Sequence, residues 1–297
     1  MKKFLIITVI LLTLLAALAG LLIGVATRFA LLEVFLSLAP VNSVISETNV
    51  LVLGVDNVFG HRSDTIMVAH VNPAKKEVAV VSIPRDTIVI IPDRGLDKIN
   101  HAFAYGGVEL SRKTIEGFLH LDIPYYVTVN LAGIEKLIDD LGGIEINVEK
   151  RMYYMDYAGD LYINLQPGRQ KLNGKQAMGY LRFRHTDNDF ARIHRQQDFL
   201  KTLVAELMKR ENLLRSPGLF LSLLGCIETN LNSREILGLA LSVRGAFELG
   251  QVEMNMIPGS DLMVDGIYYW RPNEAETQKI IGQFFLGKKL ALSESGR

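Results

Sequence analysis

Residues 49–56 read NVLVLGVD, and this stretch decides the class of fold. It is short, rich in valine and leucine, and ends in an aspartate, as a buried β-strand does. Residues 65–71 and 77–83 repeat this character and are separated from it and from each other by turn residues. We therefore predict three strands close together in the chain.

Helical patterns follow these strands at residues 108–120 and 132–141, and Gly142-Gly143 predicts a C-cap for the second. The remaining predicted elements are a strand at 143–148, helices at 189–209 and 233–247, a strand at 251–257 and a helix at 273–285. Strands that alternate with helices favour a layered α/β (α+β) domain around a central sheet. Since no repeat or linker interrupts residues 49–297, we predict one domain.

The N-terminal segment predicts a membrane anchor. Residues 4–27 carry no charge and follow Lys2-Lys3. As a helix they span roughly 36 Å, slightly more than the hydrocarbon core. The lysines are expected on the cytoplasmic side. We predict a cytoplasmic tip and one transmembrane helix in 1–28, a juxtamembrane stalk in 29–48, and an extracytoplasmic domain at the cell membrane. A signal peptide cleaved after Ala17-Leu18-Ala19 is the alternative, and it also exports the domain.

Composition excludes several classes of function. The formal net charge is zero at pH 7, which argues against a nucleic-acid partner. A single cysteine, Cys226, rules out an intramolecular disulfide. The six histidines lack zinc-site spacing, and neither a GxxxxGK phosphate loop nor a GxSxG turn is present.

Two aspartates stand where a metal site is expected. Asp56 ends the first strand, and Asp64 follows a short loop. Ligands gather beyond the carboxyl ends of strands in open sheets, and two carboxylates there suit Mg²⁺. Taken singly, each aspartate is as readily explained as a turn former or a helix cap.

Two further segments supply arginines that are candidates for the same site. The third strand ends in Arg85-Asp86, which is either part of the same site or a routine surface ion pair. Residues 180–184 read YLRFR. If this segment is extended, Arg182 and Arg184 share one face; if it is the end of a helix, they diverge.

The predicted helix at 189–209 carries the sharpest clue. Arg192 and Gln196 lie on the stripe that holds Phe199 and Leu203. An arginine on a core-facing stripe is costly unless it is paired or meets an anion. Together with Arg62, Arg85, Arg182, Arg184 and Arg195, Arg192 makes six arginines, which exceed the need of a monophosphate and suit a pyrophosphate. A purely structural network of Arg–Asp pairs is the alternative.

Together these motifs resemble the LytR–CpsA–Psr family of cell-envelope proteins. The matching segments keep the family order across residues 49–200 and comprise GVD at 54–56, RSDT at 62–65, SIPRDT at 82–87, KIN at 98–100 with Gly106-Gly107, Ile138-Asp139 to Gly143, and RFR at 182–184 with Asp189, Arg192, Arg195 and Gln196. The loop between Asp56 and Arg62 looks short for the family, which leaves contacts to the acceptor open.

The resemblance implies a mixed sheet flanked by helices with an apolar lipid pocket. It also implies transfer of an anionic glycopolymer from a polyprenyl-pyrophosphate carrier to a peptidoglycan sugar hydroxyl. Asp56 and Asp64 are expected to hold Mg²⁺, and Arg85, Asp64 and Asp86 are the candidate catalytic residues, with either aspartate as the base. The pyrophosphate-binding candidates are Arg62, Arg85, Lys98, Arg182, Arg184, Arg192, Arg195 and Gln196. A non-catalytic binder of polyprenyl pyrophosphate that regulates the envelope and a lipid pyrophosphatase are the alternatives.

Overall fold

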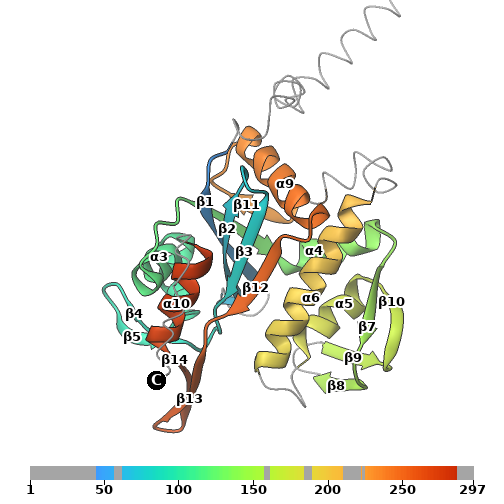
Figure 1. Ribbon diagram of the computed structural model, residues 1–297. Helices are drawn as coiled ribbons and strands as arrows, with labels where there is room; N and C mark the ends of the chain where they lie inside the picture. Colours follow the sequence, from blue (N-terminus) through green and yellow to red (C-terminus); the bar gives the residue numbers. More distant parts are fainter. Residues whose placement is uncertain are drawn as a thin grey trace, which may run out of the picture.

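A computed structural model describes residues 45–56, 62–156, 161–183, 189–209 and 225–285, together with Ser222. Its central element is a six-stranded mixed sheet in the order β11-β6-β1-β2-β3-β12 (Figure 1). The sheet strands are β1 (Thr48–Asp56), β2 (Arg62–Asn72), β3 (Glu77–Ser82), β6 (Tyr125–Asn130), β11 (Ile227–Thr229) and β12 (Val252–Met256). The predicted strands at 49–55, 65–71, 77–83 and 251–257 are therefore confirmed, as is the sheet flanked by helices.

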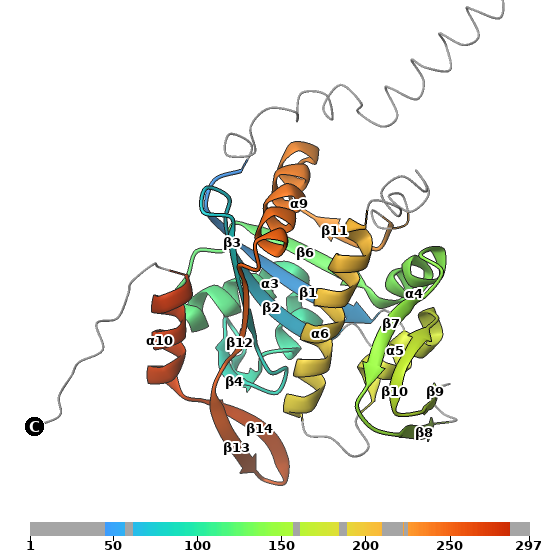
Figure 2. The same cartoon turned by 45° about the vertical axis from the view of Figure 1, so that its right-hand side comes forward.

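Helices cover both faces of the sheet. One face packs against α3 (His101–Leu119) and α10 (Glu274–Phe284), and the other packs against α6 (Asp189–Met208) and α9 (Ser233–Glu248) (Figures 1 and 2). Apolar residues of β1 point to both faces, since Leu51 and Leu53 join the α3 side and Val52 joins the α9 side. A strand buried on both sides reads as a continuous apolar run, which is why residues 49–56 predict the fold.

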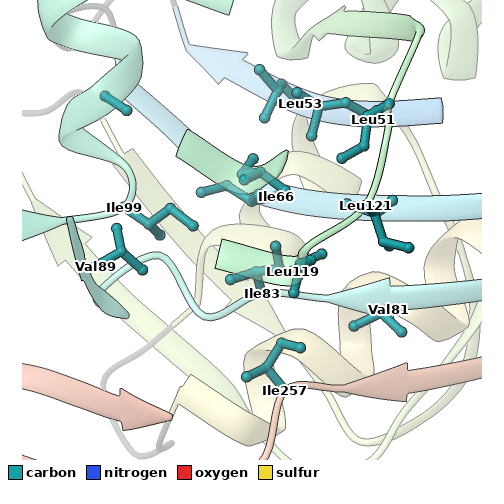
Figure 3. Packing of buried hydrophobic residues seen from close by; sticks show 14 of the residues in the cluster. Leu51, Leu53, Ile66, Val81, Ile83, Val89, Ile99, Leu119, Leu121 and Ile257 are labelled. Atoms are coloured by element: carbon teal, nitrogen blue, oxygen red, sulfur yellow. The ribbon is translucent and has the colours of Figure 1, made fainter. Parts of the chain in front are cut away.

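The core on the α3 side is formed by side chains from several elements. Leu51 and Leu53 of β1, Ile66 of β2 and Val81 of β3 meet Leu119 at the end of α3 (Figure 3). α3 contains a kink at Gly106-Gly107, where Gly107 has a φ of 62°. Only glycine adopts that backbone readily, so the helical pattern of the sequence begins at residue 108.

A second group of helices and strands packs beside the central sheet and has its own apolar core. It consists of α4 (Leu131–Asp140), α5 (Gly174–Arg182) and the hairpin partners β7 (Ile144–Val148), β8 (Met152–Asp156), β9 (Leu161–Leu165) and β10 (Gly168–Leu172). Together with α6 these elements share one apolar core. Gly142 follows α4 at a φ of 78°, and its N–H donates to the Asp139 carbonyl over 2.8 Å. The predicted glycine C-cap is confirmed.

Two smaller hairpins complete the described chain: β4 (Ile88–Ile91) with β5 (Gly95–Lys98), and β13 (Gly259–Val264) with β14 (Ile267–Pro272). Among the described residues, no helix is long and apolar enough to cross a membrane. The predicted anchor in 1–28 and the stalk up to residue 44 lie outside the described residues and stay predictions. The apolar lipid pocket also stays a prediction.

Candidate functional site

The candidate site lies at one edge of the central sheet. β1 runs parallel to β6 and β3 runs parallel to β12, while β2 is antiparallel to both β1 and β3. The carboxyl ends of four strands and the amino end of β2 therefore meet at one edge. Asp64, at the start of β2, and the Arg85-Asp86 segment after β3 both lie there. Motifs that are about twenty residues apart in the sequence are brought together by strand direction alone.

A β-bulge sets the position of Asp64. Gly54 pairs with Thr65 and Val55 pairs with Ser63, so Asp64 has no partner on β1. Such bulges turn a side chain away from the regular alternation and are common beside active sites. Gly54 permits the close approach of the strands here, because a Cβ at this position would lie 2.9 Å from the Thr65 Cβ.

Arg85 joins two carboxylates. Its Nη1 donates to Asp64 Oδ1 over 2.5 Å, and its Nε donates to Asp86 Oδ2 over 3.4 Å. The Arg85 side chain is 22% exposed and that of Asp64 is 41% exposed. The guanidinium is therefore fixed by the chain yet reachable from solvent, as recognition of an anion requires.

Lys98 binds the other oxygen of Asp86, since its Nζ lies 2.7 Å from Oδ1. The backbone between these residues is also tied down, because the Ile99 N–H donates to the Thr87 carbonyl and the Asn100 N–H donates to that of Arg85. The SIPRDT and KIN motifs therefore form one unit that presents Arg85 and Lys98 around Asp86.

The pKa of Asp86 reflects this surrounding charge. Burial of the carboxyl raises its pKa, but the hydrogen bond from Lys98 and the charges of Arg85, Lys98 and Arg192 outweigh burial, so that the pKa is lowered from 3.8. A carboxylate held as an anion in this way is a weak base. The charge of Arg192, on α6, thus also acts on Asp86. Four of the predicted residues are joined by ion pairs at this edge, namely Asp64, Arg85, Asp86 and Lys98, and Arg192 acts on them by its charge.

Acid titration tests this network. Because the folded-state pKa of Asp86 is lowered, its ion pairs stabilise the fold above the ordinary value of 3.8 and lose that contribution as the pH falls below it. We expect the free energy of unfolding of the wild type to fall more steeply than that of Asp86→Asn between about pH 5 and about pH 3. Urea unfolding at each pH measures this. Equal slopes for the two proteins would contradict the lowered pKa.

Helix α6 carries the buried arginine that the sequence predicts, Arg192, and a second buried arginine, Arg195, that it does not. Arg192 and Arg195 are each only 3% exposed. Phe199 and Leu203, further along the helix, are also buried, and Gln196 is half-buried. The core-facing position of Arg192 is therefore confirmed. Arg195 donates from Nη2 to the Phe183 carbonyl over 2.5 Å and lies 5.9 Å from the Tyr180 and Phe183 ring centroids. Its described contacts are thus to the end of α5, and a role toward pyrophosphate stays a prediction.

Of the two conformations considered for residues 180–184, the extended one is wrong for residues 180–182, which are helical. Tyr180 to Arg182 form the last turn of α5, and the extended backbone begins only at the C-cap, Phe183. Arg182 therefore lies on a helix and not on a strand, and Arg184 lies outside the described residues. Asn173 explains the helix, since it forms a capping box with Gln176. This signal was present in the sequence.

Asp139 of the family-like segment has a structural contact. Its Oδ1 accepts the Gly174 N–H over 2.8 Å, at the start of α5. A Cβ at Gly174 would lie 2.2 Å from the Glu135 carbonyl oxygen, so only glycine allows this approach of α5 to α4. Since α5 ends at Arg182, Asp139 helps to place that arginine.

Several predicted site residues are described only in part or not at all. Asp56 and Arg62 pair in register as the last residue of β1 and the first of β2. Their side chains lie outside the described structure, as do Arg184 and the side chain of Asp189. Among the described residues, no group of three His, Cys, Asp or Glu side chains forms a metal site.

Asp64 offers an oxygen of the kind that Mg²⁺ binds. Asp64 Oδ1 contacts Arg85, and its Oδ2 makes no hydrogen bond to any described residue. Asp56 stands one strand away at the same edge. Few protein oxygens at an open site suit Mg²⁺, which keeps several waters and shares substrate phosphate oxygens.

The profile of the LytR_cpsA_psr family matches residues 37–284. The chain belongs to this family. The resemblance seen in the sequence is thereby confirmed, and the match reaches well past residue 200, where the family-like motifs end.

Two proteins of known name are similar in sequence to this LytR–CpsA–Psr chain. The "Polyisoprenyl-teichoic acid--peptidoglycan teichoic acid transferase TagU" of Enterococcus faecalis is 34% identical over 78% of this chain and 77% of its own length. The "Regulatory protein MsrR" of Staphylococcus aureus is 38% identical over 66% of this chain, and the match spans only 61% of MsrR.

A solved structure supports the same relationship. TagT (YwtF) of Bacillus subtilis with bound octaprenyl pyrophosphate superposes with a TM-score of 0.61 at 27% identity, covering 80% of this chain and 89% of TagT. The mixed sheet with flanking helices is therefore the fold of a family member that binds a polyprenyl pyrophosphate.

Sequence reasoning missed two parts of the site of this LytR–CpsA–Psr protein. Gln197, buried on α6, donates from Nε2 to Ser82 Oγ over 3.0 Å and to the Asn255 carbonyl over 3.1 Å. It fixes α6 against the ends of β3 and β12. The β13–β14 hairpin was also missed, although Asp265-Gly266, both at positive φ, is the two-residue turn signal that predicts one.

Proposed function

We propose that this protein is a phosphotransferase that moves an anionic glycopolymer from a polyprenyl-pyrophosphate carrier to a peptidoglycan sugar hydroxyl. The observation that carries the proposal is the cationic cluster of Arg85, Lys98 and Arg192 around Asp86, at the strand edge where Asp64 is exposed. TagU, a transferase of teichoic acid, and TagT, which binds octaprenyl pyrophosphate, support the substrate class by similarity.

The proposed reaction is a displacement at phosphorus. The acceptor hydroxyl oxygen attacks the phosphorus atom that carries the glycan, and the bond from that phosphorus to the bridging oxygen of the pyrophosphate breaks. Polyprenyl phosphate leaves with the electron pair of this bond, and the hydroxyl proton passes to a carboxylate. Little covalent chemistry is left to the protein, so positioning and neutralisation of charge provide most of the catalysis.

We assign these tasks to the residues of the site. Arg85, which is held between Asp64 and Asp86, would bind the pyrophosphate, and Lys98 and Arg192 would add positive charge. Asp56 and Asp64 would hold Mg²⁺, which supplies charge neutralisation at the phosphate oxygens when bound. Because the pKa of Asp86 is lowered, we assign Asp86 to positioning Arg85 and Lys98 and favour Asp64 as the base.

The membrane is part of the proposal. Residues 4–27 would anchor the chain once in the cell membrane, with the domain on the extracytoplasmic side, where the lipid carrier and peptidoglycan meet. Burial of lipid CH₂ groups, at about 0.8 kcal/mol each, would then supply much of the affinity for the carrier.

A non-catalytic regulator is the second candidate, because MsrR is named a regulatory protein. One experiment separates the candidates: the full chain is incubated with a lipid-linked glycan, Mg²⁺ and peptidoglycan. Covalent glycan on peptidoglycan supports the transferase. Polyprenyl phosphate released without that product indicates a pyrophosphatase, and bound but unchanged lipid indicates a regulator; either result would overturn the proposal.

A further inference from the structure

The hairpin β13–β14 is fixed against the charged cluster. The Trp270 N–H donates to the Asp86 carbonyl over 2.8 Å, and Trp270 forms an isolated parallel bridge with Thr87. The Trp270 ring is buried, and its Nε1 donates to the Ile257 carbonyl over 3.3 Å. Figures 1 and 2 show the hairpin beyond the end of β12, next to β4. The backbone of β14 is thus bonded directly to the segment that carries Asp86.

The two faces of the hairpin differ in chemistry. By register, Tyr269 lies opposite Leu262 and Arg271 lies opposite Ser260, and these four residues share one face. The half-buried Tyr269 ring has its centroid 5.4 Å from Lys98 Nζ. This face therefore begins at the lysine that binds Asp86 and extends outward along β14.

The charge on this face is positive. Arg271 is exposed, its Nη2 contacts Ser260 Oγ over 3.3 Å, and it forms no ion pair with any described residue. Neither acidic residue of the hairpin reduces this charge. Asp261 lies on the opposite face, where it accepts from the Tyr268 hydroxyl over 2.9 Å, and Asp265 stands in the turn.

We infer that Tyr269 and Arg271 form a subsite for the donor glycan, binding the first sugar-phosphate residues beyond the pyrophosphate. The inference rests on the proposed function. An aromatic face suits the C–H face of a pyranose, and an exposed guanidinium suits a phosphate. The apolar tail of the lipid carrier does not suit a cationic face. The anionic glycan does, and it follows the pyrophosphate, which we assign to the site that contains Lys98.

Binding of two probes tests the subsite. One is a short polyprenyl pyrophosphate, and the other is the same lipid carrying one N-acetylhexosamine with a glycerol phosphate. We expect the full-length protein to bind the sugar-phosphate probe roughly tenfold more tightly. Tyr269→Leu and Arg271→Gln should each remove most of this advantage and leave affinity for the bare pyrophosphate unchanged. Tyr268→Leu, on the opposite face, and Arg244→Gln, on α9, are the matched controls.

The possible failures are distinguishable. If the wild type binds neither probe, the proposed function and the subsite both fall. If it binds the two probes equally, or if Tyr269→Leu and Arg271→Gln weaken both probes alike, the subsite is overturned and the proposed function stands. Variants that raise the KM for peptidoglycan but keep donor affinity would assign the face to the acceptor, and would also overturn the inference.

Discussion

Replacement of Arg85 by alanine is expected to lower the rate of glycan transfer roughly 10²- to 10³-fold, the usual loss when one preorganised donor is removed from a reacting centre. Arg85 holds Asp64 and Asp86 in place and is still accessible to a ligand. The variant should remain folded, because Lys98 still neutralises Asp86. Arg182→Ala, at the end of α5, should reduce transfer similarly, because we assign that arginine to the pyrophosphate site.

The measurement is transfer of labelled glycan from its lipid carrier to peptidoglycan, with Tm recorded for each variant. Arg244→Ala removes an exposed arginine that pairs with Glu248 on α9, and it should leave transfer unchanged. Arg85→Lys keeps the charge but loses the planar fork, so it should restore only part of the rate. Full activity in Arg85→Ala or Arg182→Ala would remove that residue from the assignment.

Sequence reasoning succeeded where one local pattern has one structural meaning. The apolar run at 49–56 fits only a buried strand, and the stripe of Arg192, Phe199 and Leu203 requires one buried helix face. The burial of Arg192 follows from that stripe, and with it the expectation of an anion or acidic partner. The charge of Arg192 helps to lower the pKa of Asp86, which agrees with the expectation of an acidic group within its reach.

The failures have two physical causes. The segment at 180–184 alternates, but tertiary packing and the cap at Asn173 make it helical up to Arg182. The contacts of Gln197 and Trp270 join segments far apart in the chain, and no spacing in the sequence encodes them. Likewise, the bulge at Asp64 arises from pairing between β1 and β2. Sequence therefore identified the charged residues of the site better than it identified the residues that hold them.

Removal of Mg²⁺ is expected to abolish transfer by the wild type, and Asp64→Asn is expected to raise the Mg²⁺ concentration needed for half-maximal rate by at least roughly tenfold. The reason is that Asp64 offers one carboxylate oxygen that accepts no hydrogen bond from a described residue, at the sheet edge where Asp56 ends β1. The rate is measured after chelation and during readdition of Mg²⁺. A second readout is the rise in Tm on adding Mg²⁺, which Asp64→Asn should reduce.

Saturating Mg²⁺ separates the two roles proposed for Asp64. If it is a metal ligand alone, excess Mg²⁺ should return Asp64→Asn to nearly the wild-type rate. If it also accepts the hydroxyl proton, the rate should stay lower by roughly 10²-fold or more at every Mg²⁺ concentration. Asp265→Asn, in the exposed β13–β14 turn, is the matched control and should behave as the wild type in both readouts. Transfer at an undiminished rate in the chelated wild type would remove Mg²⁺ from the proposal, and the arginine cluster would then have to neutralise the pyrophosphate by itself.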